Sequence, residues 1–504
     1  MSYQELLWSD QLGVPILALL QLVPLLLAIL ITYARRYQIA FSAALMGTLS
    51  VFLMTVVLYS LYEPDNPAMQ FAEQVTLYGP IQYHAAIDGV SVIFLLLTSF
   101  LTLILIPYGR LRPMEPSWRF LALTLTIEST LISQFVTVDL LWFTMVSGLQ
   151  LMLVGYLIWY WATSPEINAS FVRYMQFMFV SGVLLFVGTI MLGLNHSNMT
   201  GGTWSFDLFD LVKTPAPLVD QSILFFVIFY GLSIRIPVFP FHGWLAPIIQ
   251  HGTVAVAPIF LLSLKVGIFG LVRFVFPLTP EGITHWHTAV VTIAVVGVFY
   301  ATLLALIQKN LRSLLAFAVI SHTSILIIGL FSLGHAAFQG GVMLSINFGL
   351  AVACLFFTLG FIQNRTRTMI ISRLGGLYES FPIIGSVFII AGLSIIGMPG
   401  TPGFDAIHLI LEAAIERFGA VVTIPAALGN VAAAGFLLWA FQRAFMGEKP
   451  DKPFVNPVPV RTLERLLSIV VIAVLLVTGF YSTPWFHLTD GSLVELGNLY
   501  QLTH

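Results

Sequence analysis

The sequence predicts an all-α protein that crosses a membrane about fourteen times. Of its 504 residues, 58% are hydrophobic and only 9% are charged, whereas a soluble domain carries about 25% charged residues. The mean hydropathy is +0.95, and the apolar residues form continuous runs of about 20 residues, the length that a spanning helix needs. Such runs exclude a transmembrane β-barrel, whose strands alternate in polarity over about 10 residues.

Composition also excludes a soluble enzyme, a disulfide-stabilised secreted scaffold, a disordered chain and a nucleic-acid binder. The net charge of −2 indicates no bulk electrostatic partner. The single cysteine, Cys354, lies in an apolar run and can form neither an internal disulfide nor a cysteine metal site. The segments between the runs are too short for a nucleotide, flavin or iron–sulfur domain, so we expect no cofactor and no metal.

Breaks that contain charged residues, proline or glycine separate the apolar runs and define the individual spans. The first run follows the acidic stretch MSYQELLWSD and lacks the basic region of a signal peptide, so we expect it to be retained. The predicted spans are 12–33, 39–61, 86–108, 119–137, 139–162, 171–194, 221–246, 250–277, 287–307, 313–334, 338–363, 380–408, 419–446 and 463–482.

The basic residues predict the orientation, because cytoplasmic loops are enriched in lysine and arginine. One set of alternate loops holds 16 of the 21 basic residues: Arg35, Arg36, Arg110, Arg112, Arg119, Arg173, Lys309, Arg312, Arg365, Arg367, Arg373, Arg443, Lys449, Lys452, Arg461 and Arg465. This face is therefore expected to be cytoplasmic, in what we expect to be a bacterial inner membrane. Both termini and the acidic loops 62–85 and 194–220 then lie on the other side.

Two spans contain internal proline and glycine, at 235–244 and 397–405. In a membrane such breaks are tolerated where protein or water satisfies the freed backbone groups. Because the breaks lie five spans apart, they indicate two inverted repeats, as in many transporters. We expect N-terminal helices at 1–118, repeats at 119–277 and 287–446, and a C-terminal helix and tail at 447–504; two unrelated kinks are the alternative.

Ionisable residues inside the spans are the candidates for a proton pathway, because charge in a bilayer is costly and faces the protein interior or water. Lys265 stands out because its run contains no other charge nearby, and a buried lysine can exchange a proton near neutral pH. His322 has hydroxyl residues beside it and suits a relay, although a lone membrane histidine is often only a satisfied interhelical hydrogen bond. The candidates are Glu128, Arg235, Lys265, His322, Asp405 and His408.

Several motifs resemble the antiporter-like membrane subunits of respiratory complex I and of multisubunit Na⁺/H⁺ (Mrp) antiporters, especially the chain M (chain 4) type. They occur in the family's order between about residues 80 and 480. The matching stretches are 87–92 (IDGVSV), 139–143 (DLLWF), 236–245 (IPVFPFHGWL), 264–274 (LKVGIFGLVRF), 321–323 (SHT), 373–377 (RLGGL), 397–401 (GMPGT) and 442–447 (QRAFMG). The resemblance implies fourteen helices, two inverted five-helix repeats and a line of charged residues that moves protons along the membrane midplane.

The chain departs from the family pattern at four positions. The glutamate that the resemblance leads one to expect in the fifth span is Gly148, with Gln150 nearby, and the expected lysine of the seventh span is Arg235. Arginine does not deprotonate in proteins, so it can influence a proton but not carry it. Asn347 and Ile407 replace a histidine and a glutamate.

These losses favour a specialised member that is coupled to a partner other than the usual quinone-reducing arm. Within the family, a redox arm and a carbonic-anhydrase-like zinc protein of an inorganic-carbon uptake complex both stay open as the partner. The first functional hypothesis is a proton-translocating subunit, with Lys265 and His322 as carriers, Arg235 as modulator and an exit near Asp405 and His408. Glu128 would pair with Arg235. The alternatives are a non-conducting membrane scaffold that anchors a cytoplasmic enzyme, and a stand-alone Na⁺/H⁺ antiporter. In each case the chain catalyses no bond chemistry and contacts other subunits and lipid, not nucleic acid.

Overall fold

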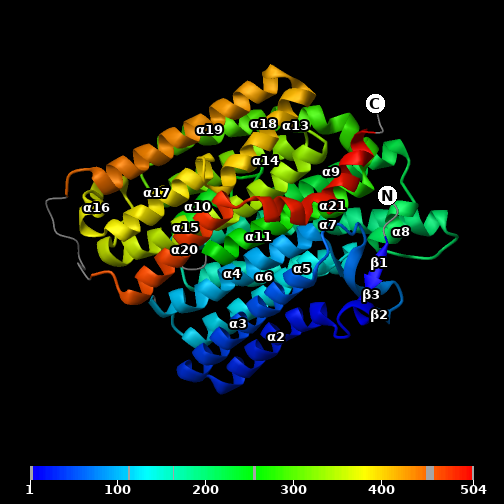
Figure 1. Cartoon of the computed structure of the whole chain (residues 1–504), viewed down its shortest axis with the longest axis horizontal. Helices are drawn as coiled ribbons and strands as arrows, with labels where there is room; N and C mark the ends of the chain where they lie inside the picture. The colour runs from blue at the N-terminus through cyan, green and yellow to red at the C-terminus, as the bar shows by residue number, and fades with distance from the viewer. Residues whose placement is uncertain (1–3, 112–113, 163, 254–256, 450–458, 502–504) are drawn as a thin grey trace.

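A computed structural model of the chain describes residues 4–111, 114–162, 164–253, 257–449 and 459–501. Arg112 and Lys452, which entered the orientation argument, lie outside the described residues. The helices run along the long axis of the molecule (Figure 1). They are α1 (Trp8–Gln11), α2 (Ile16–Ala34), α3 (Tyr37–Leu61), α4 (Gly89–Leu111), α5 (Ser117–Val136), α6 (Leu140–Tyr160), α7 (Ile167–Met199), α8 (Leu208–Lys213), α9 (Leu218–Arg235), α10 (Leu245–His251), α11 (Ala257–Gly270), α12 (Phe276–Leu278), α13 (Pro280–Leu306), α14 (Leu311–Leu330), α15 (His335–Thr366), α16 (Leu377–Ser380), α17 (Pro382–Ile396), α18 (Pro402–Phe418), α19 (Ala420–Phe441), α20 (Thr462–Phe480) and α21 (Thr483–Gln501).

Each of the fourteen predicted spans coincides with a helix or with two or more consecutive shorter helical segments. Among the described residues, eleven helices are individually long and apolar enough to cross a membrane. Helices α14 and α15 are buried along almost their whole length, as expected for helices that are apolar on all sides. Helices α2, α3, α19 and α20 expose large apolar side chains on the outside of the bundle, where a lipid-facing surface is expected. The protein is therefore a polytopic, mainly α-helical membrane protein.

The loops predicted at the acidic face are folded. Strands β1 (Glu5–Leu7), β2 (Met69–Tyr78) and β3 (Ile81–Ile87) form a small sheet in which β1 is parallel to β2 and β2 is antiparallel to β3. The short helix α8 lies at the same end of the molecule (Figure 1). The segments 62–85 and 194–220, predicted as loops between spans, therefore contain β2, most of β3 and α8.

Both predicted helix breaks are present. The first separates α9 from α10 over residues 236–244, and the second separates α17 from α18 over residues 397–401. Gly397 and Gly400 have φ values of 78° and 86° in the second break, a conformation that glycine adopts without steric cost. The division into inverted repeats remains a prediction.

The region predicted as a C-terminal tail is helix α21, which packs against α4 and α15. Strand β1 and the end of α21 lie at the same end of the molecule (Figure 1). This arrangement agrees with an even number of spans.

Candidate functional site

Arg235 lies at the end of α9, at the first break, and is buried. Its Nε donates to the backbone oxygen of Ser263 on α11 at 3.0 Å. Its Nη atoms donate to Ser147 Oγ and Gln150 Oε1 on α6, and to Gln134 Oε1 on α5 at 3.3 Å. All four acceptors are neutral, so the guanidinium is held by hydrogen bonds without an opposite charge.

Gly148 stands where the resemblance led us to expect a glutamate, and its place on α6 shows why a carboxylate there would not reach Arg235. A Cβ atom built on Gly148 meets no atom within 4 Å, so this position faces away from the neighbouring helices. Ser147 and Gln150 are the residues of α6 that face the cation. The side chains of α6 that contact Arg235 are therefore neutral, whereas the resemblance had led us to expect a carboxylate on this helix.

Glu128 does not pair with Arg235, and that expectation was wrong. Its Oε1 accepts a hydrogen bond from Thr102 Oγ1 on α4, and its Oε2 has no hydrogen-bond partner among the described residues. Along α5, Glu128 is six residues from Gln134, which contacts the arginine, and this spacing is about 9 Å along a helix. The carboxyl group faces α4, whereas Arg235 faces α6.

Lys265 lies in the middle of the helical segment that begins with α11 and is only 4% exposed. Its Nζ lies 4.9 Å from the ring centroid of Phe348 on α15, a cation–π geometry. Within the part of the chain that the structure describes, the Nζ forms no hydrogen bond and no ion pair. The backbone oxygen of Ser263, two residues earlier on α11, accepts from Arg235, so Arg235 contacts the helix that carries Lys265.

His322 on α14 is 1% exposed and stacks on Phe348, with ring centroids 5.2 Å apart. Its Nδ1 lies 3.2 Å from the oxygen of Ala318, and its Nε2 lies 3.0 Å from the oxygen of Ile395. Because a neutral imidazole carries one N–H, both contacts are hydrogen bonds only when the ring carries two protons. Phe348 thus contacts both predicted proton carriers.

The end of α17 is capped by three side chains from other helices. His322 contacts the oxygen of Ile395, Asn347 Nδ2 donates to the oxygen of Ser394 at 3.0 Å, and Asn430 Nδ2 donates to the oxygen of Ile396 at 2.7 Å. Ser394 Oγ also donates to Asn347 Oδ1 at 2.6 Å. The last carbonyls of a helix have no partner inside it, and these donors supply one within the bundle.

The remaining candidates lie on α18, beyond the second break. Asp405 Oδ2 accepts a hydrogen bond of 2.6 Å from Ser482, at the junction of α20 and α21. His408 is exposed and Ile407 is buried. The structure therefore brings Lys265 and His322 to the two sides of Phe348 and places Arg235 against the helix that carries Lys265. No hydrogen bond or ion pair among the described residues joins Glu128, Asp405 or His408 to these three.

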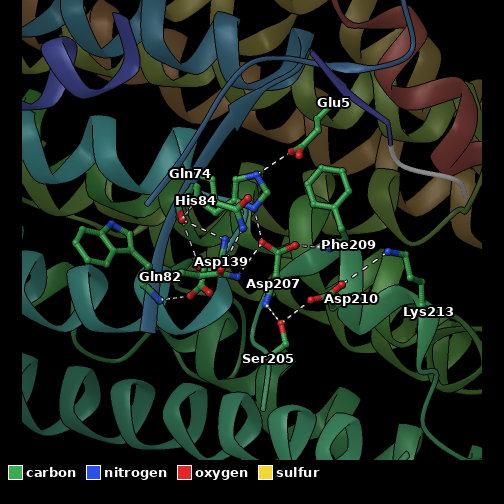
Figure 2. A network of polar contacts seen from close by, with 12 residues as sticks. Glu5, Gln74, Gln82, His84, Asp139, Ser205, Asp207, Phe209, Asp210 and Lys213 are labelled. Atoms are coloured by element: carbon green, nitrogen blue, oxygen red, sulfur yellow. Dashed lines mark hydrogen bonds and ion pairs between the residues drawn. The ribbon is translucent and has the colours of Figure 1, made fainter. Parts of the chain in front are cut away.

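A second polar network lies at the end of the molecule that carries the sheet (Figure 2). His84 on β3 contacts Asp207 through Nδ1 and Glu5 on β1 through Nε2, the latter at 2.9 Å. Asp207 is the N-cap of α8, and Asp139 is the N-cap of α6. The network joins the sheet to the start of two helices.

Two groups of this region have shifted pKa values. Burial lowers the pKa of His84, but the hydrogen bond and charge of Asp207, together with Glu5, raise it above its ordinary value. Burial raises the pKa of Glu73 on β2 to about 7, against the effect of hydrogen bonds from the backbone N–H groups of Leu17 and Ala18. Those bonds, of 2.8 and 2.9 Å, cap the start of α2.

Comparison with known proteins places the chain in a family. A model described as "NADH:quinone oxidoreductase/Mrp antiporter, TM" matches residues 137–431. The chain belongs to this family. Subunit M of the NADH-quinone oxidoreductase of Rickettsia conorii is 30% identical over 423 residues, which cover 82% of this chain and 83% of the relative.

Two further comparisons extend the match. The F(420)H(2) dehydrogenase subunit M of Methanosarcina mazei is 29% identical over 445 residues, 87% of this chain and 89% of the relative. A chain of respiratory complex I from Thermus thermophilus has a TM-score of 0.85 at 24% identity and covers 96% of this chain and 99% of that chain. The structural likeness establishes that the antiporter-like fold extends over almost the whole protein.

Within this antiporter-like chain, several residues of the site were not singled out from the sequence. Phe348 and Asn430 lie in apolar helices, where nothing in the pattern separates them from packing residues. Arg273 forms an ion pair of 2.6 Å with Asp88 at the start of α4. Arg273 could have been found by the rule already used for Lys265, since it is the second charged residue of the same predicted span, 250–277.

Proposed function

We propose that this chain is the proton-translocating, antiporter-like membrane subunit of a multisubunit complex and that Lys265 is the group that binds and releases the proton. The buried ionisable side chains between the two helix breaks support this proposal. Arg235 donates to the oxygen of Ser263 on α11, the helix that carries Lys265. Lys265 and His322 both contact Phe348, and His322 also contacts the oxygen of Ile395.

The chemistry of the two cations assigns their roles. Lysine can release its proton in a protein interior, whereas arginine remains charged. Arg235 then acts as a fixed positive charge held against α11, the helix that carries Lys265. Proton movement past Phe348 to His322 needs rearrangement or water, because an aromatic ring carries no exchangeable proton.

The test is proton flux into liposomes that contain the chain, purified together with its partner subunits. We expect Lys265→Ala to lower the flux by about a hundredfold, the lower range of what a positioned proton-transfer group contributes. Lys213→Ala, at an exposed lysine on α8, is the matched control and should leave the flux unchanged. Arg235→Lys should retain or raise the flux, because lysine can carry the proton that arginine cannot. Equal flux in Lys265→Ala and the unchanged protein would refute the proposal.

A non-conducting scaffold is the second candidate function. It is supported by the neutral partners of Arg235 and by the structural use of His322 as a cap for α17. In that case every variant above conducts as slowly as a liposome without protein, while the complex still assembles.

We also propose a redox arm as the partner, in a bacterial inner membrane. This is supported by the relatives, which are subunits of an NADH-quinone oxidoreductase and an F(420)H(2) dehydrogenase. The carbonic-anhydrase-like alternative is supported by the departures at Arg235 and Asn347. Mass spectrometry of proteins that co-purify with a tagged chain separates the two: redox subunits favour the first, and a zinc protein favours the second.

A further inference from the structure

Two hollows lie along helix α4 on the outside of the bundle, and together they are called the groove. Helix α4 packs against α3 on one side and α20 on the other, and these three helices are seen side by side in Figure 1. Residues of both α3 and α20 line a hollow over α4. The groove therefore has α4 as its floor and α3 and α20 as its walls.

The end of the groove near the arginine-rich face is basic. A hollow of about 500 Å³ lies between the end of α4 and the start of α20, lined by Arg110, Arg461, Thr462 and three leucines. Both arginines are exposed. None of the ion pairs within the described residues involves either of them. One turn further along α20, Glu464 is occupied by an ion pair of 2.6 Å with Arg365.

The guanidinium of Arg110 is also held in place. Its Cζ lies 5.3 Å from the ring centroid of Phe41, at the start of α3. Cation–π contact of this kind restrains an arginine without neutralising its charge. The basic end thus offers two positive charges, of which that of Arg110 is restrained, at the level where α3 begins and α4 ends.

The other part of the groove is apolar. A cavity of about 490 Å³ is lined by Phe52 of α3, Phe100 of α4 and Val474 of α20, among others, and reaches Asn347 and Pro402 beside the second helix break. Phe100 is ten residues from Arg110, about 15 Å along the helix. Ile93, which also lines the cavity, is seventeen residues from Arg110, or about 26 Å. The cavity therefore begins at about the depth of one leaflet, half of the roughly 30 Å hydrocarbon thickness of a bilayer, and continues beyond it.

We propose that the groove binds one anionic phospholipid, with its phosphate on Arg110 and Arg461 and one acyl chain in the cavity beside the second break. Charge complementarity selects an anionic headgroup, and basic pockets between membrane helices are typical sites for such headgroups. The apolar lining and its depth fit the chain of the same molecule. This inference is independent of proton conduction.

The experiment uses the full-length chain, stripped of lipid in detergent and titrated with dioleoylphosphatidylglycerol or dioleoylphosphatidylcholine. Native mass spectrometry measures retained lipid, and the melting temperature measures stabilisation. We expect the chain to prefer the phosphatidylglycerol, and Arg110→Gln with Arg461→Gln to reduce that preference about thirtyfold, as for the loss of two basic contacts.

Two further variants make the result specific. Arg173→Gln with Arg443→Gln removes the same charge from exposed positions outside the groove, and should keep the preference. Val474→Trp fills the cavity and should weaken the binding of both lipids while Arg110 and Arg461 are intact. Equal binding of the two lipids by the unchanged chain, or a full preference in the Arg110/Arg461 variant, would overturn the proposal, as would unchanged binding in Val474→Trp.

Discussion

At the scale of single residues, His84 offers a measurable dependence of stability on pH. Its folded pKa lies above its ordinary value, so the folded state binds the proton more tightly than the unfolded state. The stabilisation is then complete below the unfolded pKa of about 6.5 and is lost as the pH rises through the folded pKa. We expect His84→Gln to cost about 3 kcal/mol at pH 6, because it leaves Asp207 buried without its partner, and less at higher pH.

Melting temperatures of the two proteins between pH 5.5 and 9 check this. Glu73 also makes the stability of both proteins fall as the pH rises. Its folded pKa is raised to about 7, so its ionisation is less favourable in the folded state than in the unfolded state. The difference between the proteins therefore isolates His84. A difference that stays constant across this range would show that the histidine is not charged in the folded protein.

Among single residues, the burial of the candidates could be predicted from the sequence, but their contacts could not. Burial of Lys265 and His322 was predicted, because an isolated ionisable residue in an apolar run avoids lipid. The partners of Arg235 were not predicted, because they depend on how α5 and α6 are rotated about their axes. Consecutive residues of a helix point about 100° apart. The rotation of α6 about its axis therefore decides whether Gly148 or Ser147 faces the cation, and one sequence does not contain that information.

At the scale of helices, the end of α17 depends on donors from α14, α15 and α19. We expect Asn347→Leu to destabilise the protein by about 2 kcal/mol, because it leaves the carbonyl and hydroxyl of Ser394 without their partner. Unfolding in a detergent titration measures the change. Ser386→Ala, which removes a hydroxyl bonded only within α17, should change stability by less than about 0.5 kcal/mol. Equal stability of the two variants would mean that water or another group caps the helix.

The helices themselves were largely predicted, since continuous apolar runs of this length have one stable form in a membrane. The sheet and α21 were not. Strand β2 is buried along its first half and exposed along its second, so it lacks the regular alternation that identifies a strand. Helix α21 is too polar for a span, and its position is set by packing against α4 and α15.

At the scale of the whole molecule, the orientation in the membrane rests on the distribution of charge. The sheet end carries acidic side chains such as Glu5 and Asp207, whereas Arg110, Arg443 and Arg461 lie on segments at the opposite end (Figure 1). Basic segments stay in the cytoplasm during insertion. The hairpin of β2 and β3 is then expected outside the cytoplasm, together with both termini.

Cysteine labelling can test this orientation without removal of a native cysteine, because the only native cysteine, Cys354, is buried. Tyr78 at the hairpin is 83% exposed and Met446 at the opposite end is 62% exposed. A membrane-impermeant maleimide applied to intact spheroplasts should label Tyr78→Cys at once and Met446→Cys only after lysis. The unchanged chain should remain unlabelled in both conditions and serves as the control. The reverse pattern would place the arginine-rich face outside, and the proposed lipid site would then lie in the other leaflet.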